Sequence, residues 1–211
     1  MCIRDRAYNE GTEAELAKKL PLHEAVLSMV IQHHPPPQIA QSYRIPRIWK
    51  GDLDSDVGKS LLSCDDNGPR VMMITNVIVD PQAGLVAVGR LFSGSINDGD
   101  AVYLLGARRE GRVQSVNMFM GPFREIVGRL TAGNIPALLG LEYARAGETV
   151  SSIKGIVPFE QIKYVSEPVV TIAVESKYPK DLPKLVDSLR KLSIEDPNLI
   201  TRINEELSLI H

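Results

Sequence analysis

Apolar residues between Pro21 and His34 recur at the three- and four-residue spacing that forms one face of a helix. Pro21 suits the first turn of that helix, because its missing N–H would have no intrahelical partner there. The run Pro35–Pro37 follows, and proline both lacks a donor and restricts the residue before it. The pattern therefore predicts a helix that ends before these prolines.

Further along, the pattern changes to short strand-like runs bounded by Gly, Pro, Asn and Asp. Short strands at such spacing favour a closed antiparallel barrel, which removes sheet edges by joining them. Pro136 cannot donate to a ladder, so an edge position or a bulge is expected there. The predicted strands are Val71–Val79, Leu85–Phe92, Ala101–Leu105, Arg112–Met120, Ile135–Leu141 and Thr149–Ile153. The predicted fold is thus mainly β.

A second, smaller pattern begins after Ser166-Glu167-Pro168, which marks a boundary. Val169–Glu175 is predicted as a strand, Asp181–Leu192 as a helix with one apolar stripe, and Leu199–Ile203 as a strand. Asp181 is a suitable N-terminal cap for the helix. The C-terminal part is therefore predicted as a truncated α/β piece with the order strand, helix, strand.

Composition and charge narrow the class of protein. The chain has 211 residues, 44% of them hydrophobic and 24% charged, which is typical of a globular protein. A formal net charge of −2 argues against binding DNA or RNA by bulk charge, so any RNA contact must come from local patches. Apolar runs are too short to cross a membrane. Cys2 and Cys64 form no disulfide framework, which favours a reducing, cytoplasmic compartment. Trp49 is expected in core or interdomain packing, with ligand stacking as the alternative.

Three motifs that resemble catalytic or ligand-binding signatures fail on their spacing. Gly58-Lys59-Ser60 resembles the end of a phosphate-binding loop, but Leu53 stands where that loop needs glycine. The acidic run Asp52–Asp56 lacks the glycine and glutamate that complete a calcium loop. His33 and His34 are adjacent and so do not face one way on a helix. No catalytic, cofactor-binding or metal-binding residue is predicted, although sequence leaves a purely spatial combination open.

The arginines are the one feature of the sequence that indicates a binding function. Arg108–Arg112 holds three of them in an expected hairpin turn, and Arg124 follows. Guanidinium groups bind phosphate oxygens in a bidentate manner, so such a loop can hold a protein on RNA without reading base sequence. The candidate RNA-contacting residues are Arg108, Arg109, Arg112 and Arg124. A charged, solvated loop without a ligand remains the alternative.

Several segments together resemble the archaeal and eukaryotic elongation factor 2 family of translation GTPases. They are Asp80–Gly106, Gly121-Pro122, Ala132–Ser152 and RIPRIWKGD at Arg44–Asp52. The resemblance runs from about Leu22 to Glu206 and is to a middle part of that factor. It implies a GTPase-domain tail helix at 7–38, a linker at 39–70, the β-barrel second domain at 71–165 and a truncated, half ferredoxin-like third domain at 166–211. Residues 1–6, MCIRDR, have no counterpart and are interpreted as a non-native leader.

The resemblance also implies a function. The family drives GTP-dependent translocation of tRNA and mRNA, and this part would dock on small-subunit ribosomal RNA and relay motion between domains. GTP and Mg²⁺ belong to the GTPase domain, which is missing here, so whether this chain counts as an enzyme is uncertain and it should be inactive alone. Two alternatives stay open: a standalone, non-enzymatic ribosome-binding module, and part of a paralogous ribosome-maturation or spliceosomal GTPase.

Overall fold

A computed structural model describes residues 10–19, 21–80, 82–160, 170–196, 198–204 and 209–210. The chain divides into two compact units, Met1–Ala40 and Gln41–His211. The expected leader at residues 1–6 and the expected boundary at 166–168 lie outside the described residues.

The predicted N-terminal helix is confirmed. Helix α2 (Glu13–Lys19) precedes α3 (Leu22–His33), for which Pro21 is the N-cap residue. The helix ends where proline begins to restrict the backbone, and the His34 N–H donates to the Val30 carbonyl at 2.9 Å as the last helical bond.

Two helices occupy the segment that was expected to be a linker. Helix α4 (Pro37–Ile48) contains Pro46, and α5 (Asp56–Ser63) begins after Ser55, whose hydroxyl accepts a hydrogen bond from the Gly58 N–H at 3.0 Å. A Cβ on Gly58 would overlap the backbone of Asp52 and Leu53, so glycine is needed here for close packing of a helix. Gly58-Lys59-Ser60 therefore lies on a helix and not in a phosphate-binding loop.

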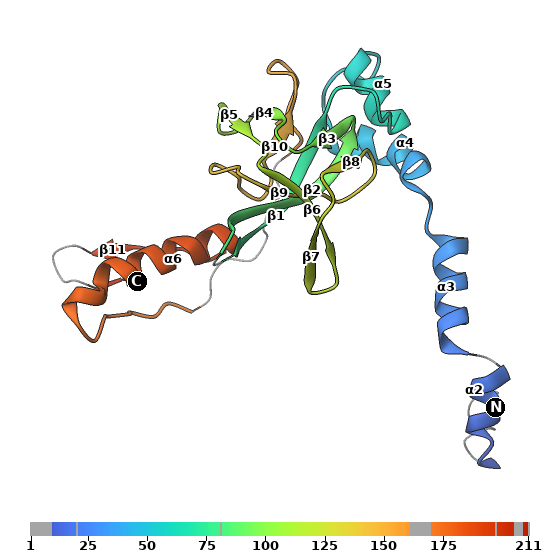
Figure 1. The fold of residues 1–211 in the computed structure, drawn as a ribbon, viewed down its shortest axis with the longest axis horizontal. Coiled ribbons are helices and arrows are strands. Elements are labelled where there is room, and N and C mark those ends of the chain that lie inside the picture. Colours follow the sequence, from blue (N-terminus) through green and yellow to red (C-terminus); the bar gives the residue numbers. More distant parts are fainter. Residues whose placement is uncertain are drawn as a thin grey trace. The chain divides into compact units, whose positions relative to one another are not determined.

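Most strands belong to one antiparallel sheet of eight strands in the order β5-β4-β10-β1-β2-β9-β6-β7, and β3 pairs with β8 in a separate ladder (Figure 1). The strands are β1 (Val71–Asp80), β2 (Gly84–Ser93), β3 (Ser95–Asn97), β4 (Ala101–Leu104), β5 (Arg109–Arg112), β6 (Ser115–Met120), β7 (Phe123–Ile126), β8 (Arg129–Thr131), β9 (Ala137–Leu139) and β10 (Thr149–Ser151). The prediction of mainly antiparallel β structure is confirmed. The ladders between described residues do not join β5 to β7, so closure of the barrel stays a prediction.

The interior of this sheet is apolar. Its buried side chains come from most of the strands and include Met72, Ile74, Leu91, Leu104, Val116 and Leu138. Gly89 of β2 pairs with Ile74 of the neighbouring strand β1. The two backbones approach so closely there that a Cβ on Gly89 would overlap the Met73 carbonyl oxygen. Glycine is required at this position because no side-chain atom fits between the strands.

Two strand predictions need correction. The predicted strand Arg112–Met120 is broken in two, because the Val113 N–H donates to Asp100 while the Gln114 N–H donates to Leu139, and the chain changes partners between them. The expectation of an edge or bulge at Pro136 is wrong. Pro136 precedes β9, a central strand paired with both β2 and β6, and its carbonyl accepts a hydrogen bond from the Gly89 N–H at 3.2 Å.

A second apolar cluster joins the helical segment to one end of the sheet. Trp49 is 3% exposed and packs with Ile45, Leu61, Val71, Phe92 and Phe159. Its indole N–H donates to the Val157 carbonyl at 2.7 Å. The buried amide of Gln41 donates to the carbonyls of Leu61 and Phe92, at 2.6 and 2.9 Å. The prediction that Trp49 is a packing residue is confirmed.

The C-terminal helix is confirmed, but its flanking strands differ from the prediction. The 3-10 turn η1 (Pro179–Asp181) leads into α6 (Leu182–Glu195), and Asp181 makes no side-chain capping bond. Among described residues, the predicted strand Val169–Glu175 is reduced to an isolated bridge at Val174, and β11 (Ile203–Asn204) pairs with β12 (Leu209–Ile210). A strand needs a hydrogen-bonding neighbour, and apolar alternation alone does not supply one.

Helix α6 is attached to the sheet near its own C-terminal end. The N–H of Val79, near the end of strand β1, donates to the Glu195 carboxylate at 2.6 Å, and Ile194 packs against the core of the sheet. These contacts link α6 to the sheet. None of the helices within the described ranges is long and apolar enough to cross a membrane.

Candidate nucleic-acid interface

The β4–β5 hairpin carries three of the four candidate arginines. Leu105–Arg108 forms its turn, in which Arg108 has the left-handed φ of 53°, and Arg109–Arg112 is strand β5. The expectation that Arg108–Arg112 is itself the turn is therefore wrong. The β4–β5 ladder is longer than the charged sequence suggested, because it pairs Ala101 with Arg112 and Leu104 with Arg109. Charged residues are compatible with a strand at the edge of a sheet.

The turn is held by a carboxylate from a distant segment. Glu148 accepts hydrogen bonds from the backbone N–H groups of Gly106 at 2.7 Å and Ala107 at 3.0 Å. A third bond comes from the N–H of Thr149, also at 3.0 Å. With hydrogen bonds from three donors, the Glu148 carboxylate holds the backbone of the turn that also contains Arg108.

Strand alternation separates the arginines of β5. Successive side chains point to opposite faces of a strand, so Arg109 shares one face with Gly111, and Arg112 shares the other with Glu110. Arg109 lies over the ring of Tyr143, with 5.1 Å from its guanidinium carbon to the ring centroid. Arg112 donates from Nε to the Gly99 carbonyl at 3.0 Å. The structure therefore places Arg109 and Arg112 on opposite faces of β5, and Arg108 lies exposed in the turn before it.

The Arg112 face carries a further cation that sequence reasoning missed. Lys154 forms an ion pair with Glu110 and lies 5.5 Å from the centroid of the Tyr103 ring. The ammonium of Lys154 lowers the pKa of Glu110, and the carboxylate in turn raises the pKa of Lys154. Both groups are exposed, so solvent screens this pair and its effect on stability is small.

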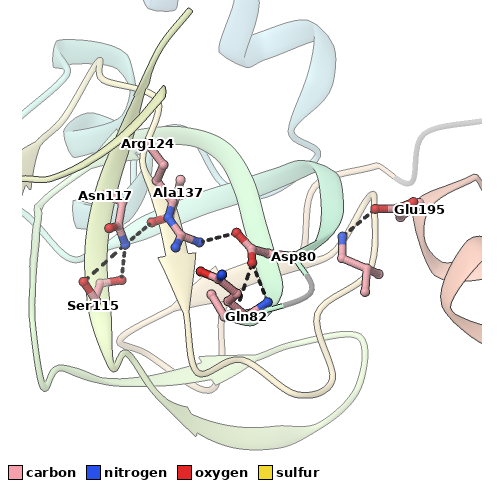
Figure 2. A network of polar contacts seen from close by, with 9 residues as sticks. Asp80, Gln82, Ser115, Asn117, Arg124, Ala137 and Glu195 are labelled. Atoms are coloured by element: carbon pink, nitrogen blue, oxygen red, sulfur yellow. Dashed lines mark hydrogen bonds and ion pairs between the residues drawn. The ribbon is translucent and has the colours of Figure 1, made fainter. Parts of the chain in front are cut away.

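Arg124 lies on β7, away from the other three. Its guanidinium forms an ion pair with Asp80 at 3.2 Å, at the end of β1 (Figure 2). The Asp80 carboxylate also accepts hydrogen bonds from the N–H groups of Gln82 at 2.8 Å and Ala83 at 3.0 Å. Arg124 is therefore already engaged within the protein, unlike Arg108, whose turn position leaves it exposed.

The groups around Asp80 make its contribution to the stability of the fold depend on pH. Hydrogen bonds from Ala83 and Gln82, and then the charge of Arg124, lower the pKa of Asp80 below its ordinary value. A carboxylate whose pKa is lower in the folded state contributes stability above its unfolded pKa of about 3.9, and that contribution disappears as the pH falls through the folded pKa.

We expect Asp80→Asn to lower the urea midpoint near pH 7 and to have no effect in strong acid, where Asp80 is protonated in both states. Urea titrations followed by circular dichroism across this range will measure the difference. Asp187→Asn, which removes an exposed ion pair with Lys191 on α6, is the matched control. A deficit in Asp80→Asn that stays constant with pH would contradict the expectation.

Other candidate chemistry does not assemble in the part of the chain that the structure describes. Within it, no three His, Cys, Asp or Glu side chains gather in a way that could hold a metal ion. Cys64 is buried, and burial, followed by the nearby charge of Asp66, raises the pKa of its thiol. His211 lies outside the described residues. The arginines and their aromatic neighbours are therefore the site to explain.

Comparison with known proteins places this sheet in a family. The family described as Elongation factor Tu domain 2 matches residues 84–151, which run from β2 to β10. Elongation factor 2 of Cenarchaeum symbiosum is 62% identical over 200 residues, covering 95% of this chain and 27% of that protein. Elongation factor 2 of Staphylothermus marinus is 54% identical over 204 residues (94% and 28%). That of Sulfurisphaera tokodaii is 55% identical over 207 residues (95% and 28%).

The chain thus spans little more than a quarter of the length of these curated relatives, while the relatives account for nearly all of it. Identity of this degree extends from the helical segment through the sheet to α6, well beyond the 84–151 match. The chain belongs to the elongation factor 2 family and corresponds to a segment of its members.

Proposed function

We propose that this chain is the ribosome-docking and relay segment of a translation elongation factor that catalyses GTP-dependent translocation of tRNA and mRNA. The support is its 62% identity to an elongation factor 2 over 95% of its length. The relatives compared above all carry that name, which favours a translocation factor over a ribosome-maturation or spliceosomal paralogue. GTP and Mg²⁺ would bind in a GTPase domain outside this segment, and the segment would act in the cytoplasm, with no catalytic residue of its own.

The proposed docking surface is the β4–β5 hairpin. Arg108 and Arg109 present exposed guanidinium groups beside a turn that Glu148 holds in place. Arg112 extends the positive charge to the other face of β5, and Arg124 is a second contact, available to RNA phosphate in exchange for Asp80. Guanidinium groups on a fixed hairpin suit backbone phosphates of small-subunit ribosomal RNA, which position a protein without specifying sequence.

The relay role rests on rigidity. A barrel closed between β5 and β7, as in the family resemblance, would carry a displacement from one end to the other because close-packed cores transmit strain. The Trp49 cluster at one end and the Glu195 contact at the other are the proposed points where neighbouring domains would act on it.

Reversal of charge at Arg108, Arg109 and Arg112 to glutamate should weaken binding to isolated small ribosomal subunits at least tenfold, roughly, because phosphate contacts become repulsive. The salt dependence of binding should become weaker: the magnitude of the slope of log affinity against log salt concentration should decrease by about three, one for each lost phosphate contact. Sedimentation of the chain with subunits over a series of salt concentrations measures both quantities.

The control carries the same change of charge elsewhere. Lys184, Arg190 and Lys191 are exposed on α6, and their replacement by glutamate alters net charge equally. Equal loss of binding in both triple variants would mean that only net charge matters, and docking by the hairpin would be rejected.

A further inference from the structure

The β4–β5 turn borders a hollow that the docking proposal does not use. Gly106 and Ala107 form one wall, the segment from Glu142 to Thr149 forms another, and Ile194 of α6 closes one side. Its volume is about 530 Å³, within the range of about 300–1,000 Å³ that is usual for small-molecule sites. Phe159 and Ala144, both nearly fully buried, contribute to an apolar lining.

Arginines outnumber carboxylates around this hollow. Arg145 lines it directly, Arg109 lies over the ring of Tyr143 at its edge, and Arg108 follows Ala107 in the chain. Of the two carboxylates in the lining, Glu148 is occupied by three backbone N–H groups, and Glu142 is exposed. Arginines around the mouth and a lining that is partly apolar suit a ligand that is anionic at one end and has flat apolar faces at the other.

An unpaired nucleotide of RNA has that chemistry. Its phosphate suits a guanidinium fork, and its base has apolar faces that stack on aromatic rings and on guanidinium planes. Tyr143 is 48% exposed, so its ring lies at the surface, and the guanidinium of Arg109 makes a cation–π contact with it. The arginines that the docking proposal assigns to phosphates therefore lie beside a space of suitable size and polarity for a base.

We infer that the hollow between the β4–β5 turn and the segment Glu142–Thr149 binds one unstacked base of single-stranded RNA, with the adjoining phosphate held by Arg108 and Arg109. This inference rests on the proposed docking function and deepens it, because it adds a contact to the base where docking needs only the phosphate. Tyr143 is the stacking residue, and Ile194 brings α6 to the same site.

The test compares two labelled probes by fluorescence anisotropy with the 211-residue chain at one fixed salt concentration. One probe is an oligoadenylate of about ten nucleotides, and the other is a ribose-phosphate chain of the same length without bases. The chain should bind oligoadenylate about tenfold more tightly than the abasic chain. Tyr143→Ala should abolish this preference by weakening the binding of oligoadenylate, and Tyr143→Phe should retain it.

Equal affinity of the unmodified chain for the two probes would overturn the inference, and so would a preference that survives in Tyr143→Ala. An acidic polypeptide is the competing ligand: displacement of oligoadenylate by polyglutamate at equal charge concentration would reject the nucleotide assignment. Salt-dependent binding to small subunits without base preference would reject only the base site. If the chain prefers oligoadenylate but the arginine-to-glutamate variant binds small subunits as well as the unmodified chain does, only the docking proposal would be rejected.

Discussion

Replacement of Trp49 by alanine should destabilise this chain by about 3–5 kcal/mol, the usual cost of truncating a buried tryptophan. The indole is 3% exposed and fills the space between the helical segment and one end of the sheet. Its loss would leave a cavity and would also remove the donor for the Val157 carbonyl. For a chain of this length each kcal/mol corresponds to about 2–4 °C, so the thermal midpoint should fall by about 6–20 °C. Circular dichroism measures it without depending on tryptophan fluorescence.

A second variant and a control separate the contribution of the Trp49 ring from that of its hydrogen bond. Trp49→Phe keeps an apolar ring but not the hydrogen bond, so it should cost less than Trp49→Ala and more than zero, about 1–3 kcal/mol. Tyr43→Ala, on the same helical segment but 43% exposed, should cost little. A Trp49→Ala midpoint within a degree or so of Tyr43→Ala would show that the Trp49 cluster does not hold the helical segment to the sheet.

Gly89→Ala should have the second-largest effect on stability, near or above the upper end of the roughly 1–3 kcal/mol that overpacking costs. The added methyl would overlap the carbonyl oxygen of Met73 and lie 2.7 Å from the Cα of Ile74. Both are backbone atoms of β1, so no flexible side chain can move aside, and the β1–β2 pairing itself must open. Urea unfolding gives the change in stability, and amide exchange should show lost protection for the residues paired across β1 and β2.

Gly155→Ala provides the matched substitution, since a Cβ at Gly155 would meet nothing within 4 Å. The same methyl group should be nearly neutral there. Equal stability of the two variants would mean that β1 and β2 separate more easily than their close approach suggests.

Sequence patterns anticipated the elements whose signal is local. The helix Leu22–His33 follows from its apolar spacing and the prolines after it, and β1, β2 and β4 follow from apolar runs between turn residues. The pattern failed where packing outweighs local preference. Helix α4 forms despite Pro46, and α5 tolerates Gly58 because that glycine allows close contact with the preceding loop.

The residues of the candidate RNA-binding site were predicted from the sequence, but their positions relative to one another were not. Arg108, Arg109 and Arg112 were identified as candidates from their cluster, but the alternation of β5, which separates Arg109 from Arg112, depends on knowing where the turn ends. The contact of Arg109 with Tyr143 and the pairing of Arg124 with Asp80 join segments that are distant in the chain. No local pattern specifies such partners, although Tyr143, two residues before Arg145, was a signal that could have drawn attention.

The attachment of α6 by the Glu195 carboxylate and the Ile194 side chain bears on how the molecule comes apart. These two contacts, one charge-assisted hydrogen bond and one half-buried aliphatic group, contribute only a few kcal/mol, roughly, far less than the pairing and packing of the sheet. We therefore expect α6 to separate from β1 before any strand of the sheet loses its partners.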